Sequence, residues 1–221
     1  MALDERKMTA TEARLAALAM PEVGCTKAAR EAALERVRRM GLPGRRDEYW
    51  KYTRPDTLVQ PDAPRAAVFD PGEPPMFDAF DRLRIVFVDG VFSPELSDAL
   101  TLEGVEIARL EDICCEREHW AEALYGRLEA RGQVPVERPL AALNTAFAGD
   151  GVVIRVTGRP SKPINLTYVH GAEDSDAFLH HLIRVEPGAE ATILENGPAA
   201  ARFNKCMEID IADGGRLHLV R

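Results

Sequence analysis

Thiols and imidazoles are the side chains in this sequence best suited to hold a metal ion, and their spacing yields one candidate pair. The four cysteines stand at positions 25, 114, 115 and 206, and no two have the C-x-x-C spacing of a zinc or redox motif. His180 and His181 are adjacent in a predicted strand, so their side chains face opposite sides. Cys206 stands at the same phase of a sequence repeat as His180. These two side chains could therefore stack on one face of neighbouring strands.

The same residues have a structural interpretation, which we favour. Cysteine is commonly buried as a small apolar side chain, and Cys114 and Cys115 would flank the apolar stripe of a predicted helix. We place His119 at the surface, His170 in a solvated turn, and His218 on the side of its strand that faces away from Leu217 and Leu219. The sequence thus predicts no catalytic residue, no cofactor-binding residue and no metal ligand in this chain.

A second chemistry-bearing stretch, GLPGRRDEYWKYT, runs from Gly41 to Thr53 and mixes charged with aromatic residues. Interleaved basic and aromatic side chains suit stacking of single-stranded nucleic acid. Here two acidic residues offset three basic ones within the stretch, which weakens that interpretation. An active-site loop would need a nucleophile or base nearby, and none is evident. We therefore predict a structural clamp in which Trp50 and one tyrosine pack inward, while Arg45, Arg46 and Lys51 stay solvated or ion-paired.

Composition and motifs narrow the function classes further. A formal net charge of −8 disfavours binding to nucleic acid or to an anionic membrane. The sequence contains neither the phosphate-binding G-x-x-x-x-G-K-[ST] motif nor a G-x-S-x-G nucleophile motif, so we predict that the chain is not an enzyme. It has no apolar run of about 18 residues and no apolar signal core at its start, and its sparse cysteines suit a reducing cytoplasm.

Two alternatives remain open from the residues alone. The first is an enzyme that uses the face of Cys206 and His180. The second is a stand-alone β-helical module that binds a carbohydrate or similar ligand, which would need an exposed row of aromatic side chains. After residue 150 the aromatic residues are Tyr168, Phe178 and Phe203, and this small number disfavours the second alternative.

The first 150 residues mix helical and strand signals. Capping and periodicity predict a helix from about Thr9, a second from about Thr26 to Met40 that ends at Gly41, and a third from Pro139 to Ala148. Residues 110–131 have the apolar stripe of one long helix. A Pro-rich stretch, 54–78, predicts a surface traverse or linker. Residues 83–92 predict a hairpin around Asp89-Gly90, and 105–107 a short strand.

Alternating apolar residues dominate from Gly151 onward, and two pieces of this region match each other at a constant offset. Ile183-x-Val185-x-x-Gly188 aligns with Ile209-x-Ile211-x-x-Gly214. A repeat of strand, glycine corner and strand is typical of a β-solenoid, although a β-sandwich with regular hairpins also fits. Because alternation continues to Arg221, we expect the sequence to be a fragment or to be covered there by a partner. We predict divisions at residues 1–60 (helical), 61–150 (mixed) and 151–221 (solenoid core).

Four segments in order resemble the SufB/SufD family of iron–sulfur cluster assembly scaffold proteins, and the SufD branch in particular. They are GLPGRRDEYWKYT; VFVDGVFSPELSD from Val86; LAALNTAFAGDGVVIRV from Leu140; and the pair HHLIRVEPGAEATILEN and IADGGRLHLVR. The Trp-Lys-Tyr segment and the short, cysteine-free approach to the core favour SufD over SufB. The resemblance covers nearly the whole chain.

The resemblance implies a fold, a role and partners. The fold would be α+β, with an N-terminal helical domain followed by the first turns of a right-handed parallel β-helix, cut off within it. The role would be that of a non-catalytic scaffold that pairs with SufB through the β-helix and with the ATPase SufC through a C-terminal region that this sequence lacks. The complex handles iron–sulfur clusters, with ATP on SufC. The family's proposed cluster-related residues lie beyond Arg221, so no cofactor is assigned to this chain.

Overall fold

The structure is a computed structural model that describes residues 5–21, 24–68, 76–113 and 119–221. Its helical segments are α1 (Glu5–Ala16), α2 (Lys27–Met40), η1 (Glu48–Trp50), α3 (Asp56–Val59), α4 (Leu110–Ile113), η2 (Trp120–Ala123), α5 (Arg127–Arg131) and α6 (Pro139–Phe147). Its strands are β1 (Leu83–Val88), β2 (Val91–Phe92), β3 (Val105–Arg109), β4 (Val152–Val156), β5 (Ile164–Val169), β6 (Asp176–Val185), β7 (Glu190–Asn196), β8 (Arg202–Ile211) and β9 (Arg216–Val220).

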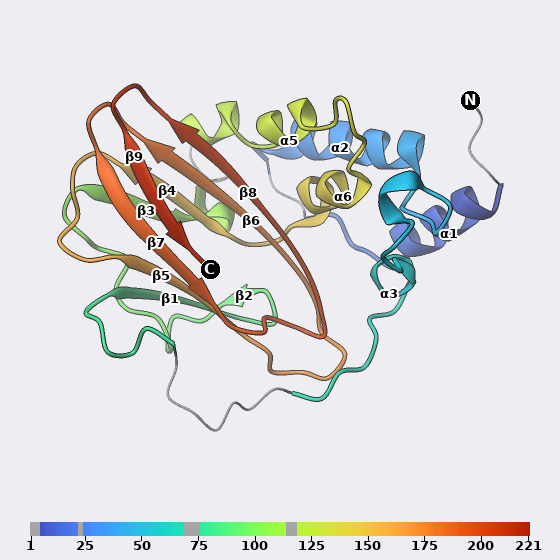
Figure 1. The fold of residues 1–221 in the computed structure, drawn as a ribbon, viewed down its shortest axis with the longest axis horizontal. Helices are drawn as coiled ribbons and strands as arrows, with labels where there is room; N and C mark the ends of the chain where they lie inside the picture. Colours follow the sequence, from blue (N-terminus) through green and yellow to red (C-terminus); the bar gives the residue numbers. More distant parts are fainter. Residues whose placement is uncertain (1–4, 22–23, 69–75, 114–118) are drawn as a thin grey trace.

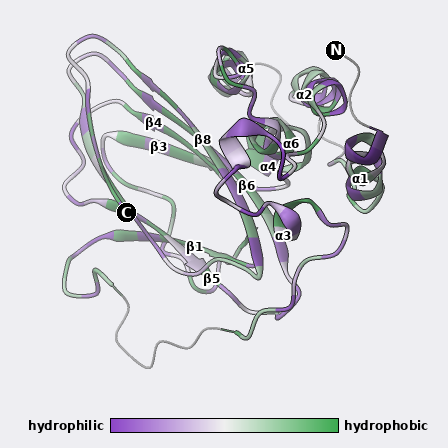
Figure 2. Cartoon of the chain, turned by 45° about the vertical axis from the view of Figure 1, so that its right-hand side comes forward, coloured by the Kyte–Doolittle hydropathy of each residue, from purple (hydrophilic) through white to green (hydrophobic). Residues whose placement is uncertain are grey.

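The strands form two sheets, and helices cover one of them. Sheet A has the order β2-β1-β5-β7-β9, and sheet B has the order β3-β4-β6-β8 (Figure 1). From β4 to β9 the chain alternates between the two sheets, and each of these strands pairs in parallel with the next strand of its own sheet. Helices α1, α2, α5 and α6 gather on the side of β6 and β8 that faces away from β1 and β5 (Figure 2).

The predicted right-handed parallel β-helix is wrong. The chain is α+β with two mixed sheets, because β1 pairs antiparallel with β2 and β3 pairs antiparallel with β4. The constant offset of the sequence repeat does have a structural counterpart: it is the register of His180 with Cys206 between β6 and β8 and of Glu190 with Arg216 between β7 and β9. A parallel register between neighbours in a sheet does not by itself define a solenoid, and the repeat carried no information about the antiparallel edges.

Three apolar clusters hold the layers together. The largest lies between the sheets and includes Ile85 and Phe87 of β1, Ile154 of β4, Leu166 of β5 and Ile183 of β6. A second cluster packs α1, α2 and α6 against Phe178, and a third packs α4 and Tyr125 against Val153 and Leu182. Strand β6 contributes to all three clusters and is therefore buried on both faces, as its nearly unbroken run of buried residues shows.

Several local predictions are confirmed. Helix α2 has Thr26 as its N-cap and Gly41 as its C-cap, and the Gly41 N–H donates to the Val37 carbonyl at 2.8 Å. The hairpin of β1 and β2 turns at Asp89 and Gly90, which both have positive φ (49° and 84°) as this tight turn requires. The strand β3 and the helix α6 also lie where the sequence predicts them. A first helix is present, but it begins at Glu5, and Thr9, predicted as its start, lies inside it with its hydroxyl bonded to the Glu5 carbonyl.

The predicted single helix over residues 110–131 is wrong. The described part of that range contains three short helical segments, α4, η2 and α5. His119 has extended backbone angles and Gly126 has φ of 72°, and neither conformation continues an α-helix. The apolar stripe was real, because Ile113, Ala121 and Leu124 all enter the third cluster. The apolar spacing over residues 110–131 therefore reflects burial of these side chains in three short segments, and not one continuous helix.

Candidate functional site

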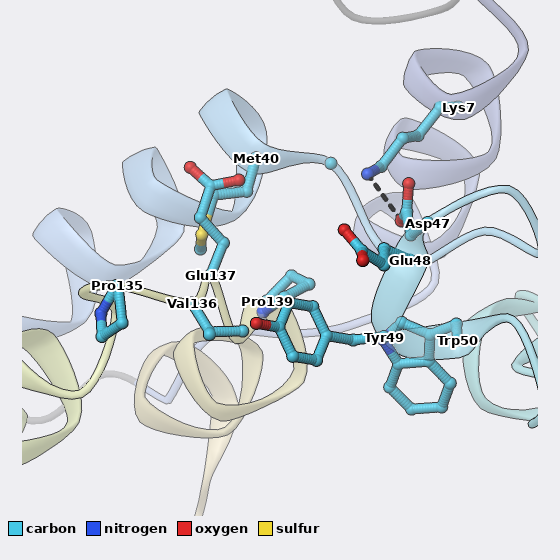
Figure 3. Close-up of a pocket in the computed structure, with 11 residues that line it drawn as sticks. Lys7, Met40, Asp47, Glu48, Tyr49, Trp50, Pro135, Val136, Glu137 and Pro139 are labelled. Carbon is cyan, nitrogen blue, oxygen red and sulfur yellow. Dashed lines mark hydrogen bonds and ion pairs between the residues drawn. The ribbon is translucent and has the colours of Figure 1, made fainter.

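Two neighbouring pockets flank the aromatic pair Tyr49–Trp50 and together form a surface groove. Their volumes are about 250 Å³ and about 290 Å³, and Tyr49, Trp50, Val136, Glu137 and Pro139 line both. In Figure 3 the Tyr49 ring extends towards Pro139 and Val136, and the Trp50 indole leaves the same loop in a different direction. The groove combines exposed aromatic, proline and aliphatic surface, which is a composition typical of protein contacts.

Local hydrogen bonds explain how the groove is positioned. The Asp47 carboxylate accepts the Gly44 N–H at 2.9 Å and pairs with the Lys7 ammonium at 2.9 Å, so it connects the loop to α1 (Figure 3). Helix η1 follows Asp47 directly and projects Tyr49 outward. The stretch from Gly41 to Thr53 thus joins α1 to the loop after α2, which is consistent with the predicted clamp.

The predicted packing of this stretch is only partly right. Trp50 is half-buried, and Arg45, Arg46 and Lys51 are not buried, as expected. No tyrosine packs inward, because Tyr49 is 71% exposed and Tyr52 is 92% exposed. The exposed tyrosines make the stretch a surface feature as well as a clamp.

A pair of substitutions separates the structural role of Trp50 from the surface position of Tyr49. We expect Tyr49→Ala to change the free energy of unfolding by no more than about 0.5 kcal/mol, because its ring is mostly in solvent. Trp50→Ala removes a half-buried indole, and we expect a loss of roughly 2 kcal/mol. Urea unfolding of both variants, with Tyr52→Ala as the exposed control, measures the difference. A Tyr49→Ala loss as large as that of Trp50→Ala would contradict the geometry.

His180 and Cys206 do lie side by side on the helix-facing side of sheet B, as the repeat suggested. They are register partners on β6 and β8, and His180 is fully buried. The His180 Nε2 lies 2.8 Å from Glu208 Oε1, so this imidazole is already engaged. Burial, followed by the Glu208 and Glu129 carboxylates, raises the pKa of Cys206 to about 12. The thiol is therefore protonated at neutral pH and is a poor nucleophile or metal ligand.

Glu208 organises this cluster. Its carboxylate is 2% exposed and accepts the backbone N–H groups of Gly126, Leu128 and Glu129 at the start of α5. Burial alone would raise the pKa of Glu208, but the hydrogen bond and charge of His180 and the backbone donors outweigh burial and lower it. The arrangement caps a short helix and fixes it to the sheet.

His181 faces the other way, into the core between the sheets, and belongs to a directed hydrogen-bond chain. The Val152 N–H donates to His181 Nδ1 at 3.0 Å, and His181 Nε2 lies 3.0 Å from the Tyr168 hydroxyl. The Tyr168 hydroxyl donates to Glu195 Oε1 at 2.6 Å, and Lys205 pairs with the same oxygen. Burial lowers the pKa of His181 well below its usual value, so the ring is neutral and Nε2 carries the proton.

Sequence reasoning missed this chain, although a signal for it existed. Each of the four strands from β5 to β8 contributes one polar residue that faces the core between the sheets: Tyr168, His181, Glu195 and Lys205. Polar residues at the inward positions of several strands indicate a buried network, because isolated buried polar groups are costly. Burial and the Glu195 carboxylate also raise the pKa of Tyr168 far above its usual value, so the hydroxyl stays a donor.

The other predicted positions have mixed outcomes. Cys114 and Cys115 lie outside the described residues. His119 is half-buried, and its Nδ1 accepts the Ala121 N–H at the start of η2. His170 is 5% exposed and lies 2.9 Å from the Ala172 carbonyl, so the predicted solvated turn is wrong for this ring. His218 is exposed and faces away from the core, as predicted.

Neither a metal cluster nor a membrane span is found in the part of the chain that the structure describes. Within it, no group of three or more His, Cys, Asp or Glu side chains is arranged to hold a metal ion. None of the described helices combines the length and apolar character needed to cross a membrane.

The aromatic residues after residue 150 do not form an exposed row. Tyr168 is 4% exposed, Phe178 is 9% exposed and Phe203 is half-buried. A carbohydrate-binding face would need such rings on the surface, so the alternative of a stand-alone ligand-binding module loses its main requirement.

Comparison with known proteins adds one clear similarity. No protein-family model matches the chain. The chain is 30% identical over 171 residues to the iron–sulfur cluster assembly protein SufD of Escherichia coli (strain K12). The match covers 74% of this chain but 37% of that protein, so the chain spans well under half the length of the curated relative that it matches. This similarity supports a place for the chain among SufD-like proteins.

Proposed function

We propose that this chain is the N-terminal part of a SufD-like scaffold subunit that takes part in iron–sulfur cluster assembly without catalysing a step itself. The observation that carries the proposal is the 30% identity to SufD over 171 residues. Four quoted segments that resemble the family, from Gly41 to Arg221, point the same way. The division into helical, mixed and strand-rich parts at residues 60 and 150, and residence in the cytoplasm, remain predictions.

The side chains with catalytic potential support a non-catalytic role. His180 is bonded to Glu208, and His181 is bonded to Tyr168 and Val152. The raised pKa of Cys206, about 12, keeps its thiol protonated. These groups stabilise contacts between elements, and none of them is left available as an activated nucleophile, base or ligand. An enzyme built on the face of Cys206 and His180 is therefore disfavoured.

The ends of the two sheets suit assembly. Strand β8 is the outer strand of sheet B, and β9 is the outer strand of sheet A, among the described residues. An outer strand has backbone N–H and C=O groups free to pair on one side, so a further strand can extend each sheet. We propose that these outer strands suit pairing with a partner protein, and that SufB and SufC are the partners of the full-length protein.

Co-purification tests the proposal. We expect the full-length protein to co-elute with tagged SufB and untagged SufC from the same organism in constant ratio through affinity and size-exclusion steps. Resin loaded with cells that lack tagged SufB is the control for non-specific retention. A full-length protein that elutes apart from both partners, at micromolar concentrations of each, would rule out the scaffold role.

A further inference from the structure

A cavity of about 210 Å³ lies between the helical layer and the ends of two strands of sheet B. Arg14 of α1, Leu58 of α3 and Leu143 of α6 line one part of it, and Asp176 and Phe178 of β6 and residues of β8 line the rest. Drug-sized ligands need about 300–1,000 Å³, so this cavity suits a smaller molecule. The cavity is separate from the groove at Tyr49, and it shares Lys205 with the hydrogen-bond chain at His181.

Positive charge exceeds negative charge around the cavity. Arg14 and Arg202 share the Asp176 carboxylate, each at 2.6 Å from its Oδ2. Lys205, which also lines the cavity, shares the Glu195 carboxylate with Arg221. The charged residues that line the cavity are therefore three cations, Arg14, Arg202 and Lys205, and one carboxylate, Asp176.

One buried donor in the cavity wall has no acceptor. The Arg14 side chain is 1% exposed; its Nη1 donates to the Pro61 carbonyl at 2.9 Å and its Nη2 pairs with Asp176. The Arg14 Nε–H, in contrast, has no hydrogen-bond partner. A buried donor on a charged group is costly to leave unpaired, and a carboxylate is among its strongest acceptors. Burial lowers the pKa of Arg14 and outweighs the opposing charge and hydrogen bond of Asp176.

The rest of the wall is apolar. Leu143 is 1% exposed and Phe178 is 9% exposed, and the Arg14 guanidinium lies 5.5 Å from the centroid of the Phe178 ring. Leu58 contributes a half-buried side chain at the edge of the same cavity. A ligand in this cavity would therefore contact a cationic end and an apolar body at the same time.

We propose that this cavity binds a small monocarboxylate with a compact apolar body, whose carboxylate accepts the Arg14 Nε–H and whose body packs against Leu143 and Phe178. The site goes beyond the scaffold role and does not depend on it. Its selectivity comes from two sources: the excess of cations favours an anion over a neutral or cationic ligand, and the apolar wall disfavours small inorganic anions.

Calorimetric titration of the full-length protein with benzoate tests the site. We expect saturable one-to-one binding of benzoate, with benzamide and inorganic phosphate at least tenfold weaker, because benzamide lacks the charge and phosphate lacks the apolar body. Failure of benzoate to bind would overturn the proposal. Equal affinity for benzoate and benzamide, or for benzoate and phosphate, would overturn it as well.

Three variants locate the binding. We expect Arg14→Gln to weaken benzoate binding at least tenfold, and Leu58→Phe to weaken it similarly by filling the cavity from its edge while leaving every cation in place. Arg30→Gln is the matched control, because Arg30 is also 1% exposed but bonds to Thr26, Ala146 and Ala148 away from the cavity. If Arg14→Gln fails to fold, Leu58→Phe still decides. Wild-type affinity in Leu58→Phe, or a tenfold loss in Arg30→Gln, would refute the assignment.

Discussion

Replacing Glu208 with alanine is expected to lower the free energy of unfolding by about 3–5 kcal/mol, because it removes the acceptor of several buried hydrogen-bond donors. The carboxylate is 2% exposed and accepts hydrogen bonds from His180 and from three backbone N–H groups at the start of α5. Alanine would leave all of these donors buried without an acceptor. Urea unfolding followed by circular dichroism measures the loss.

The pH dependence of Glu208→Gln provides a sharper test, because glutamine keeps the shape and removes the charge. The pKa of Glu208 is lowered in the folded protein from its ordinary value of 4.5. A lowered carboxyl pKa stabilises the fold above the unfolded-state value, and this contribution is lost as the pH falls through the folded-state value. The difference in unfolding free energy between wild type and Glu208→Gln should therefore be constant near pH 7 and shrink below about pH 4.5.

The control is a carboxylate on the same strand that is open to solvent. Asp210 of β8 is 50% exposed in its side chain and pairs with Arg184 at 3.2 Å. We expect Asp210→Asn to change the free energy of unfolding by less than about 1 kcal/mol. If Glu208→Gln behaves like Asp210→Asn at neutral pH, the buried carboxylate does not secure α5.

Local chemistry explains which elements the sequence could predict. Thr26 and Gly41 bound α2 because caps act on the backbone of the residues beside them. Asp89-Gly90 defines the hairpin because few other dipeptides adopt positive φ twice in succession. Alternation marked β4 to β9, and the offset of the sequence repeat matched the registers of β6 with β8 and β7 with β9.

The arrangement of these elements depends on contacts that no local pattern reports. Strands β1 and β5 are far apart in sequence yet pair in parallel, and β3 pairs antiparallel with β4 across α4 to α6. Strand β6 is buried on both faces, so its sequence does not alternate between apolar and polar residues. Strand geometry alone predicts that His180 and His181 face opposite sides. It does not predict which side chains they bond. The sequence alone assigned no role to Glu208 or Glu195, which the structure shows buried.

Replacing Arg202 with methionine is the second change expected to have a large effect, with a loss of about 3–5 kcal/mol in the free energy of unfolding. Its side chain is 4% exposed and pairs with Asp176 through Nε at 2.9 Å and Nη2 at 2.6 Å. Its remaining N–H groups donate to four backbone carbonyls, those of Thr57, Gln60, Pro61 and Asp62. One guanidinium therefore holds the chain after α3 against the ends of β6 and β8.

Hydrogen exchange can separate this local role from a general loss of stability. We expect Arg202→Met to increase amide exchange over residues 56–66 more than in α2 or β4, because the four carbonyls lose their shared donor. Arg202→Lys should recover little, since an ammonium cannot match the planar fork that bonds Asp176 and the carbonyls together. Arg155→Met is the control, as its side chain is 37% exposed and pairs with the carboxylates of Glu106 and Glu186.

Uniform exchange across the protein in Arg202→Met would mean that the contact stabilises the whole fold and not this segment in particular. Recovery by Arg202→Lys would mean that charge alone suffices. We expect faster exchange confined to residues 56–66 in Arg202→Met, and no return to wild-type exchange in Arg202→Lys. The reason is geometric. Any cation could pair with Asp176 alone, but four carbonyls that converge on one point need a donor with several N–H groups in fixed directions. The Pro-rich stretch 54–78 contains one helical turn, α3, but the described segment 60–68 forms no helix or strand, so this arginine supplies donors to carbonyls that lack such bonds there.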